Sequence, residues 1–450
     1  MEKLVRYLDP HEAASLSEAL ARDLGSPEVA VVKNLDYVYA PVELYALAPR
    51  VTSALDRVAA FAVDMDGTST TTEPLALHSL EYMVRRFTGR LSTSDWPGLD
   101  HEKDYPYVIG NSNFRHTEFL VERYKENLDL DALRQSFFEA LLWTLANMRD
   151  PQRIEDVKTN AANVGVGAVL RDPDFQAAVS REVGESDLAE LARPFVARYG
   201  AAFRADNDSA LVSAALDVYY TRYHSILRQV EGGSGDRLSR ELLGEEGRRL
   251  IEPMPGYAVF IGLVKGWLAG DAAGLCGLLR EVPSDEDRAR LDRLARRFSD
   301  SPARVGLVTA SIAYEAHAVI EEVFRVMREQ IAEWPVSTAK KRELIDRFAD
   351  YREVYDAFVT ASDSSEARLK PHRDLYSIAL YQMSIPRTDY CRCVGLEDTE
   401  PGIVSLRAAG VGCAVALPNR DTSRQDYQAA SAVVSGGLPC FILDHNAMLD

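Results

Sequence analysis

The sequence predicts a doubly wound α/β protein with a parallel sheet and a long, all-helical insertion. Short apolar runs bounded by Gly, Pro or Asp recur along the chain, as buried parallel strands do. Helix-length segments separate the later runs, which is typical of βαβ units. From about residue 74 to residue 251, apolar residues instead recur at helical spacing with little strand character.

Six short segments are expected to form buried strands. In chain order they are VAVV (29–32), AAFAVD (59–64), RVGLVTA (304–310), YDAFVTA (355–361), CRCVGLED (391–398) and VGCAVAL (411–417). Three longer segments are expected to form the helices between the later strands, namely IAYEAHAVIEEVFRVMREQIAEW (312–334), RDLYSIALYQMSI (373–385) and PGIVSLRAAG (401–410).

The 450 residues argue for two or three domains. We expect the insertion to end after EGGSGD (231–236) and one more helix, and PMPG (253–256) to return the chain to the main domain. The expected parts are an N-terminal extension (1–55), a core (56–73 and 252–450) and an all-helical cap (74–251).

Composition narrows the class of protein. A net charge of −18 argues against a nucleic-acid partner, because phosphate backbones demand a basic surface. The 5 cysteines are too few and too scattered for a disulfide framework. The N-terminal segment lacks the apolar core of a signal peptide, and no apolar run approaches membrane-spanning length. The chain is therefore expected to be cytoplasmic and not in a membrane, and its oligomeric state is left open.

Two aspartates come directly after the second apolar run. AAFAVD leads into Asp64-Met65-Asp66-Gly67-Thr68, which places two carboxylates at the carboxyl end of a strand. Open α/β sheets bind ligands at this edge, and Gly67 permits a sharp exit from the strand. Two carboxylates this close repel each other. A divalent metal between them, together with a proton on one of the aspartates, would remove this repulsion. The plainer alternative is an ordinary Asp-Gly turn.

Residues that suit phosphate chemistry come after three later strands. Thr309 ends one strand, where its hydroxyl is placed to donate to a phosphoryl oxygen, and Lys370 opens a loop, where its ammonium neutralises phosphate. Glu397 and Asp398 end another strand and are hard oxygen ligands of the kind Mg²⁺ prefers. The plainer alternatives are a helix cap, a solvated lysine and a loop before a helix. These features and the Asp64–Asp66 pair follow one another in this order, each at the end of a predicted strand, and this favours the functional interpretation.

The four segments together resemble motifs one to four of the haloacid dehalogenase (HAD) superfamily. GLEDTEPGIVSLRAAG (395–410) and DMDGTSTTTEPLALHSLEYM (64–83) are especially similar to its phosphoglycolate phosphatase and β-phosphoglucomutase branch. The resemblance implies a Rossmann-like core over about residues 56–73 and 252–440, with an enlarged helical cap inserted after the first motif. It leaves residues 1–55 and 325–352 unexplained.

The resemblance also implies a role for each matching residue. Asp64 is expected to be the nucleophile that forms an aspartyl-phosphate, and Asp66 the general acid and base whose backbone carbonyl also meets Mg²⁺. Thr309 and Lys370 are expected to hold the phosphate. Asp64, Asp66, Glu397 and Asp398 are expected to bind the metal.

Asp66 selects among branches of the superfamily, because an alkoxide leaving group needs a proton and a halide does not. Its presence predicts phosphate esters as substrates. The third motif departs from the family pattern K-P-x-P-D, since the chain has Lys370-Pro371-His372-Arg373-Asp374. The lysine of the motif is kept. The departure puts only the shape of the loop in doubt.

The resemblance also implies that a loop early in the insertion supplies substrate contacts, and the polar segment IGNSNFRHTEFLVERY (109–124) matches that loop best. A helix N-terminal loop capped by Asn or Ser is an equal alternative for this segment. Four side chains are candidates for substrate binding: Asn111, Asn113, Arg115 and His116. Packing within the cap is the expected role of another four: His78, Trp143, Tyr219 and Tyr220.

The sequence thus predicts a Mg²⁺-dependent phosphomonoester hydrolase that acts on a small phosphorylated metabolite. A sugar-phosphate mutase would use the same core and return the phosphoryl group to its intermediate. A non-catalytic interaction module built on this scaffold is a third alternative, against which the intact catalytic positions argue.

Overall fold

The structure is a computed structural model that describes residues 8–25, 28–35, 38–92, 94–108, 113–205, 207–244 and 249–448. The chain forms two compact units. The first comprises the chain up to Thr71, Pro253–Ala316 and the chain from Val323 onward, and the second comprises Thr72–Glu252 and His317–Glu322.

A six-stranded parallel sheet forms the centre of the first unit, with the strand order β10-β9-β8-β3-β6-β7. The strands are β3 (Ala60–Asp64), β6 (Arg304–Val308), β7 (Ala357–Val359), β8 (Cys393–Glu397), β9 (Cys413–Ala416) and β10 (Ala432–Val433). The chain starts at β3 in the middle, adds β6 and β7 on one side, and then adds β8, β9 and β10 on the other. This order creates a switch point beside β3, where open α/β sheets bind ligands.

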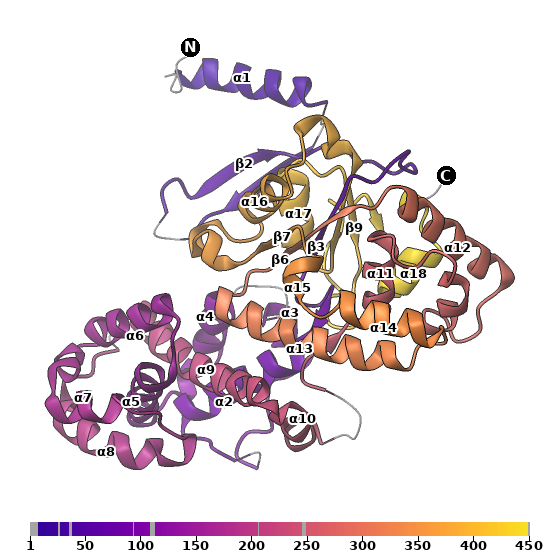
Figure 1. Ribbon diagram of the computed structural model, residues 1–450. Coiled ribbons are helices and arrows are strands. Elements are labelled where there is room, and N and C mark those ends of the chain that lie inside the picture. Colours follow the sequence, from indigo (N-terminus) through magenta and orange to yellow (C-terminus); the bar gives the residue numbers. More distant parts are fainter. Residues whose placement is uncertain are drawn as a thin grey trace. The chain divides into compact units, whose positions relative to one another are not determined.

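Helices cover both faces of this sheet (Figure 1). Ala60 and Ala62 of β3 belong to an apolar cluster that includes side chains of α16 and α17. Phe61 points to the opposite face and meets Phe260 of α11 edge-on, with ring centroids 5.1 Å apart. Alternate residues of one strand are thus buried on opposite faces, which confirms the predicted doubly wound α/β class.

The first unit contains nine described α-helices. They are α1 (Pro10–Asp23), α11 (Tyr257–Val264), α12 (Asp285–Asp300), α13 (Ala313–Ala332, of which His317–Glu322 belong to the second unit), α14 (Thr338–Arg347), α15 (Tyr351–Val354), α16 (Asp374–Gln382), α17 (Glu400–Ala408) and α18 (Gly437–Leu443).

The prediction of a buried parallel strand at residues 29–32 is wrong. Strand β1 (Val29–Lys33) pairs with β2 (Val42–Ala46) in a separate antiparallel hairpin. Burial alternates along β1, because Val31 is exposed while Val32 packs with Tyr45 against α17. Because every residue of the run is apolar, the sequence did not show that one face of this strand is exposed. Cys391 also differs from expectation, since it lies in a 3₁₀ turn before β8.

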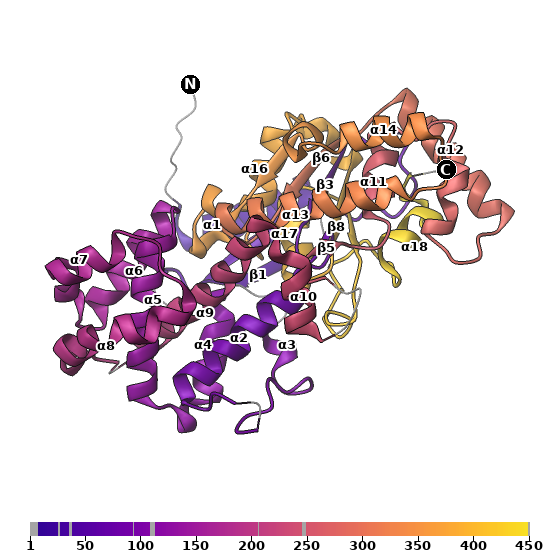
Figure 2. The same cartoon turned by 60° about the horizontal axis from the view of Figure 1, so that its bottom comes forward.

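The second unit is built from helices, and Figure 2 shows α5, α8 and α9 lying side by side within it. Its helices are α2 (Glu73–Thr88), α3 (Tyr105–Val108), α4 (Asn113–Arg123), α5 (Leu130–Asn147), α6 (Pro151–Asn163), α7 (Pro173–Val179), α8 (Leu188–Tyr199), α9 (Asp208–Gln229) and α10 (Gly235–Leu243). Asp150 and Asp172 cap α6 and α7 just before a proline, a combination that favours helix starts. A short two-stranded sheet joins β4 (Thr70–Thr71) to β5 (Glu252–Pro253).

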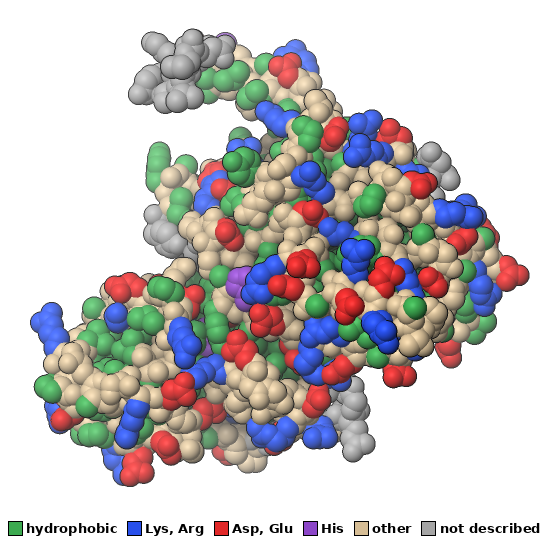
Figure 3. Space-filling model, in the orientation of Figure 1, with side chains coloured by type: hydrophobic (Ala, Val, Ile, Leu, Met, Phe, Trp, Pro, Cys, Tyr) green, Lys and Arg blue, Asp and Glu red, His purple; other side chains and the backbone are tan. Residues whose placement is uncertain are grey.

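Acidic and basic side chains are interspersed over the face shown in Figure 3. Of the helices that the structure describes, none combines the length and the apolar character needed to cross a membrane.

Candidate functional site

The first part of the site is the turn that leaves β3. Asp64 is the last residue of this strand, is buried, and lies beside Val308 of β6 in the parallel register. Gly67 has a φ of 80°, in the left-handed region that favours glycine. Its N–H donates to the Thr70 carbonyl at 2.9 Å, and the Ser69 hydroxyl donates to the Asp64 carbonyl at 2.6 Å. These bonds hold the tight turn that follows Asp64.

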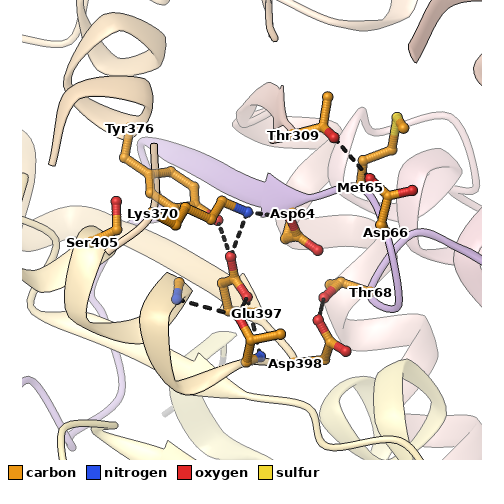
Figure 4. A network of polar contacts seen from close by, with 12 residues as sticks. Asp64, Met65, Asp66, Thr68, Thr309, Lys370, Tyr376, Glu397, Asp398 and Ser405 are labelled. Carbon is orange, nitrogen blue, oxygen red and sulfur yellow. Dashed lines mark hydrogen bonds and ion pairs between the residues drawn. The ribbon is translucent and has the colours of Figure 1, made fainter. Parts of the chain in front are cut away.

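Lys370 lies between two of the predicted site carboxylates (Figure 4). Its Nζ donates to Oδ1 of Asp64 and, at 2.6 Å, to Oε1 of Glu397. The Tyr376 ring lies beside the ammonium, with Nζ 5.2 Å from the ring centroid. The ammonium is thus held at the carboxyl ends of β3 and β8.

Glu397 is fully buried, and both of its carboxylate oxygens accept hydrogen bonds. Oε1 accepts from the Tyr376 hydroxyl at 2.8 Å as well as from Lys370. Oε2 accepts from the Thr399 hydroxyl at 2.9 Å and from its backbone N–H at 3.2 Å. A Cβ at Gly402 would lie 1.8 Å from this carboxylate, so only glycine fits at that position of α17.

Asp398 is buried beside Glu397 and is oriented by polar side chains from two other segments. The Asn419 amide donates to its Oδ2 at 2.9 Å, and the Thr68 hydroxyl donates to its Oδ1 at 3.3 Å. Thr68 belongs to the turn after β3, so this contact ties that turn to the end of β8.

Asp66 and Thr309 are brought together across the neighbouring strand ends. The Thr309 hydroxyl donates to Oδ2 of Asp66 at 2.8 Å, and the Ser311 hydroxyl donates to the same oxygen at 3.4 Å. The Ser311 backbone N–H in turn donates to Thr309 Oγ1 at 2.9 Å. In this arrangement Thr309 orients Asp66, and its predicted contact with a phosphoryl oxygen stays a prediction.

The site carries a surplus of negative charge. Burial, and then the charge of Glu397, raise the pKa of Asp64 well above its ordinary value, although Lys370 opposes this shift. Burial disfavours the Lys370 ammonium, but the charges of Asp64 and Glu397 outweigh it and raise the pKa of Lys370. One ammonium therefore faces a cluster of carboxylates that it does not neutralise.

The donor set suits a divalent cation. Asp64, Glu397 and Asp398 each offer an oxygen, and these three atoms all lie within 4.8 Å of one another. Mg²⁺ prefers hard oxygen ligands, and its charge would offset the surplus of negative charge in the site. The backbone carbonyl of Asp66 as a further ligand stays a prediction.

The predicted substrate-binding residues belong to the second unit. Asn111 lies outside the described residues. Arg115 pairs with Glu118 at 2.7 Å, and His116 is buried. Asn113 accepts a hydrogen bond from the Tyr219 hydroxyl at 3.2 Å and donates to the Tyr220 hydroxyl at 3.4 Å. A role of these side chains in substrate binding stays a prediction.

Several residues of the site were not found from the sequence. They are Thr68, Tyr376, Thr399, Gly402 and Asn419. Tyr376 fits the apolar pattern of its helix, and the sequence carries no separate signal for its contact with Glu397. Gly402 carried a weak signal, because a glycine in the first turn of a helix costs stability unless close packing requires it.

Solved structures that match the chain include HAD-family hydrolases and a β-phosphoglucomutase. CbbY from Rhodobacter sphaeroides in complex with phosphate is 14% identical, covers 84% of this chain and 93% of its own, and has a TM-score of 0.36. A HAD-family hydrolase from Deinococcus radiodurans R1 is 14% identical, with coverages of 87% and 98% and a TM-score of 0.39. β-Phosphoglucomutase from Clostridium difficile is 12% identical, with coverages of 87% and 93% and a TM-score of 0.34. No family model and no curated protein match the sequence.

Proposed function

We propose that the chain is a HAD-type, Mg²⁺-dependent phosphomonoester hydrolase that uses Asp64 as its nucleophile. One observation carries the proposal: a buried aspartate at the end of the central strand is bonded to a lysine, within 4.8 Å of two further carboxylates. Phosphoryl transfer needs positioning and charge neutralisation, and this arrangement offers a nucleophile, a fixed cation and oxygen ligands for a metal.

The reaction divides into two displacements. Asp64 attacks the phosphorus, the ester P–O bond breaks, and the leaving alkoxide takes a proton from Asp66. Asp66 then removes a proton from water, which attacks the phosphorus of the aspartyl-phosphate. The products are inorganic phosphate and the free Asp64 carboxylate.

The surrounding residues prepare these steps. Lys370 neutralises Asp64 and the transferring phosphoryl group, and Glu397 with Tyr376 fixes the position of its ammonium. Thr309 and Ser311 donate to the Asp66 carboxyl and fix its orientation. Mg²⁺, held by Asp64 and Asp398 with Glu397 beside them, would neutralise charge on the phosphoryl oxygens.

A screen of phosphorylated metabolites tests this function directly. We expect the purified protein to release inorganic phosphate from at least one small phosphomonoester when Mg²⁺ is present. Conversion of a sugar phosphate to its isomer without phosphate release would instead identify a mutase. Absence of both activities over a broad panel would favour the non-catalytic alternative.

Metal removal should abolish activity reversibly. We expect hydrolysis to disappear with EDTA and to return with Mg²⁺, while the larger Ca²⁺ should inhibit. Mg²⁺ should also raise the melting temperature of the metal-free protein, because it offsets the charge of the buried carboxylates. Asp398→Asn should remove most of that thermal shift, which differential scanning fluorimetry measures without any substrate. Full activity in EDTA would contradict the metal assignment.

The insertion is proposed to supply substrate discrimination, since the core chemistry is common to all phosphomonoesters. Arg115 is the preferred contact for a second anionic group, because a guanidinium binds carboxylate or phosphate bidentately. Its ion pair with Glu118 is half-exposed and contributes little to stability.

A further inference from the structure

The N-terminal hairpin contacts the loop that carries Lys370. Glu43 and Tyr45 are two residues apart on β2, so their side chains project from the same face of the hairpin. That face packs against the core, where the Tyr45 ring meets the His372 ring edge-on with centroids 6.0 Å apart. A segment that the family resemblance does not cover thus touches the loop that holds a predicted catalytic residue.

The hydroxyl of Tyr45 is at the centre of this contact. It donates to Oε2 of Glu43 at 2.7 Å and accepts from Nη2 of Arg368 at 3.1 Å. Nδ1 of His372 lies 2.9 Å from the same oxygen. A phenol has one proton to donate and two lone pairs, so Nδ1 of His372 carries the proton in this bond. The hydroxyl is then fully hydrogen-bonded.

The two loop residues that Tyr45 contacts flank Lys370 symmetrically. Arg368 precedes it by two positions and His372 follows it by two. The turn between them is closed by the His372 N–H, which donates to the Leu369 carbonyl at 2.9 Å. On the other side, the Ser405 hydroxyl of α17 donates to the His372 carbonyl at 2.5 Å. One phenol oxygen therefore holds both ends of the five-residue turn from which the lysine extends.

Charged side chains strengthen the contact between the hairpin and the turn. Arg368 donates to Glu43 at 2.6 Å and to Asp374 at 2.8 Å, which joins the hairpin, the turn and the start of α16. The hydrogen bonds from Arg368 and Tyr45 lower the pKa of Glu43 to about 2. Burial and the Glu43 hydrogen bond raise the pKa of Tyr45 to about 12. At neutral pH the contact is therefore an ion pair bridged by a neutral phenol.

We propose that Glu43 and Tyr45 are positioning residues for Lys370, and that the N-terminal hairpin is part of the catalytic apparatus. They fix the turn formed by residues 368–372 so that the Lys370 ammonium stays between Asp64 and Glu397. The inference rests on the proposed function, in which this ammonium neutralises the nucleophile and the phosphoryl group. Neither residue touches substrate in this account, and both act through the lysine.

The test compares Tyr45→Phe and Glu43→Gln with the native protein. Tyr45→Phe keeps the ring and removes the central hydroxyl, and we expect kcat for p-nitrophenyl phosphate to fall about 10-fold, with KM changed less than about twofold. Glu43→Gln should lower kcat similarly. The kcat of the double variant should be no lower than that of the less active single variant, because both residues act through one turn. Thermal unfolding of each variant measures the structural cost.

Arg50→Gln is the matched control. Arg50 attaches the same hairpin elsewhere, through Glu28 and the carbonyls of Gln428 and Ala430. Its loss should lower the melting temperature and leave kcat unchanged. If Tyr45→Phe lowers kcat only as much as Arg50→Gln does, the hairpin has a merely structural role and the proposal is wrong. If Tyr45→Phe does not fold, Glu43→Gln carries the same comparison.

A second readout does not depend on activity. Lys370 is buried and paired, so an amine-reactive reagent should label it slowly in the native protein, as peptide mass spectrometry measures. Tyr45→Phe should speed this labelling several-fold, while labelling of the exposed Lys103 stays unchanged. Equal labelling of Lys370 in both proteins overturns the positioning role. Failure of the native protein to hydrolyse any phosphomonoester overturns the proposed function alone, and the labelling then decides the positioning role by itself.

Discussion

Replacing Asp64 with asparagine should abolish turnover while the protein stays folded. An amide does not attack phosphorus, so we expect kcat to fall by about 10⁴-fold or more. The melting temperature of the metal-free protein should not fall, because burial and Glu397 raise the pKa of Asp64 and its ionised form therefore opposes folding at neutral pH. Steady-state hydrolysis of p-nitrophenyl phosphate and thermal unfolding measure the two effects.

Asp56→Asn is a suitable control, because Asp56 is an exposed aspartate that pairs with Arg392 at the surface. It should match the native protein in both assays. More than trace Mg²⁺-dependent hydrolysis by Asp64→Asn, with contaminating phosphatase excluded, would refute the nucleophile assignment.

Replacing Arg407 with alanine should produce a large loss of stability. The Arg407 side chain of α17 is fully buried, donates to the carbonyls of Ala48 and Ala429, and pairs with Glu28 at 2.6 Å. Truncation leaves a cavity and unsatisfied carbonyl groups, and breaks an ion pair in which the arginine is buried and the glutamate is one-third exposed. We expect the free energy of unfolding to fall by about 3–5 kcal/mol, as measured by urea denaturation.

The half-exposed Arg392 offers a matched comparison, and Arg392→Ala should leave the unfolding midpoint essentially unchanged. The side chain of Arg407 joins the end of the N-terminal segment to α17 and to the loop before β10. A loss for Arg407→Ala no larger than that for Arg392→Ala would show that this junction does not hold the N-terminal segment in place.

The sheet and the charged residues of the site were predictable because their signals are local. The β3 segment is apolar on both faces and ends in Asp64, and few arrangements other than a buried parallel strand satisfy both features. Lys370, Glu397 and Asp398 stand out because charged residues at the carboxyl ends of apolar strands are otherwise costly to bury.

The rest of the site depends on contacts between distant segments. Tyr376 is an ordinary apolar position of its helix until Glu397 is placed beside it. The N-terminal hairpin was mispredicted because the apolar side chains of Val29 and Val31 are exposed, and an apolar run does not reveal which face is covered. The contact of Tyr45 with His372 spans 327 positions of the chain, and neither residue carries a sequence signal for it.

The central claim is that turnover passes through an aspartyl-phosphate on Asp64, and chemical trapping tests it most directly. The enzyme is mixed with Mg²⁺ and a phosphomonoester that it hydrolyses, quenched in acid during turnover and treated with borohydride, which reduces an acyl phosphate of aspartate to homoserine. We expect peptide mass spectrometry to find homoserine at position 64 in the native protein, and none in a sample without substrate or in Asp64→Asn. Homoserine at another aspartate, or an unmodified Asp64 under conditions where the intermediate of a control HAD phosphatase is trapped, would contradict the account.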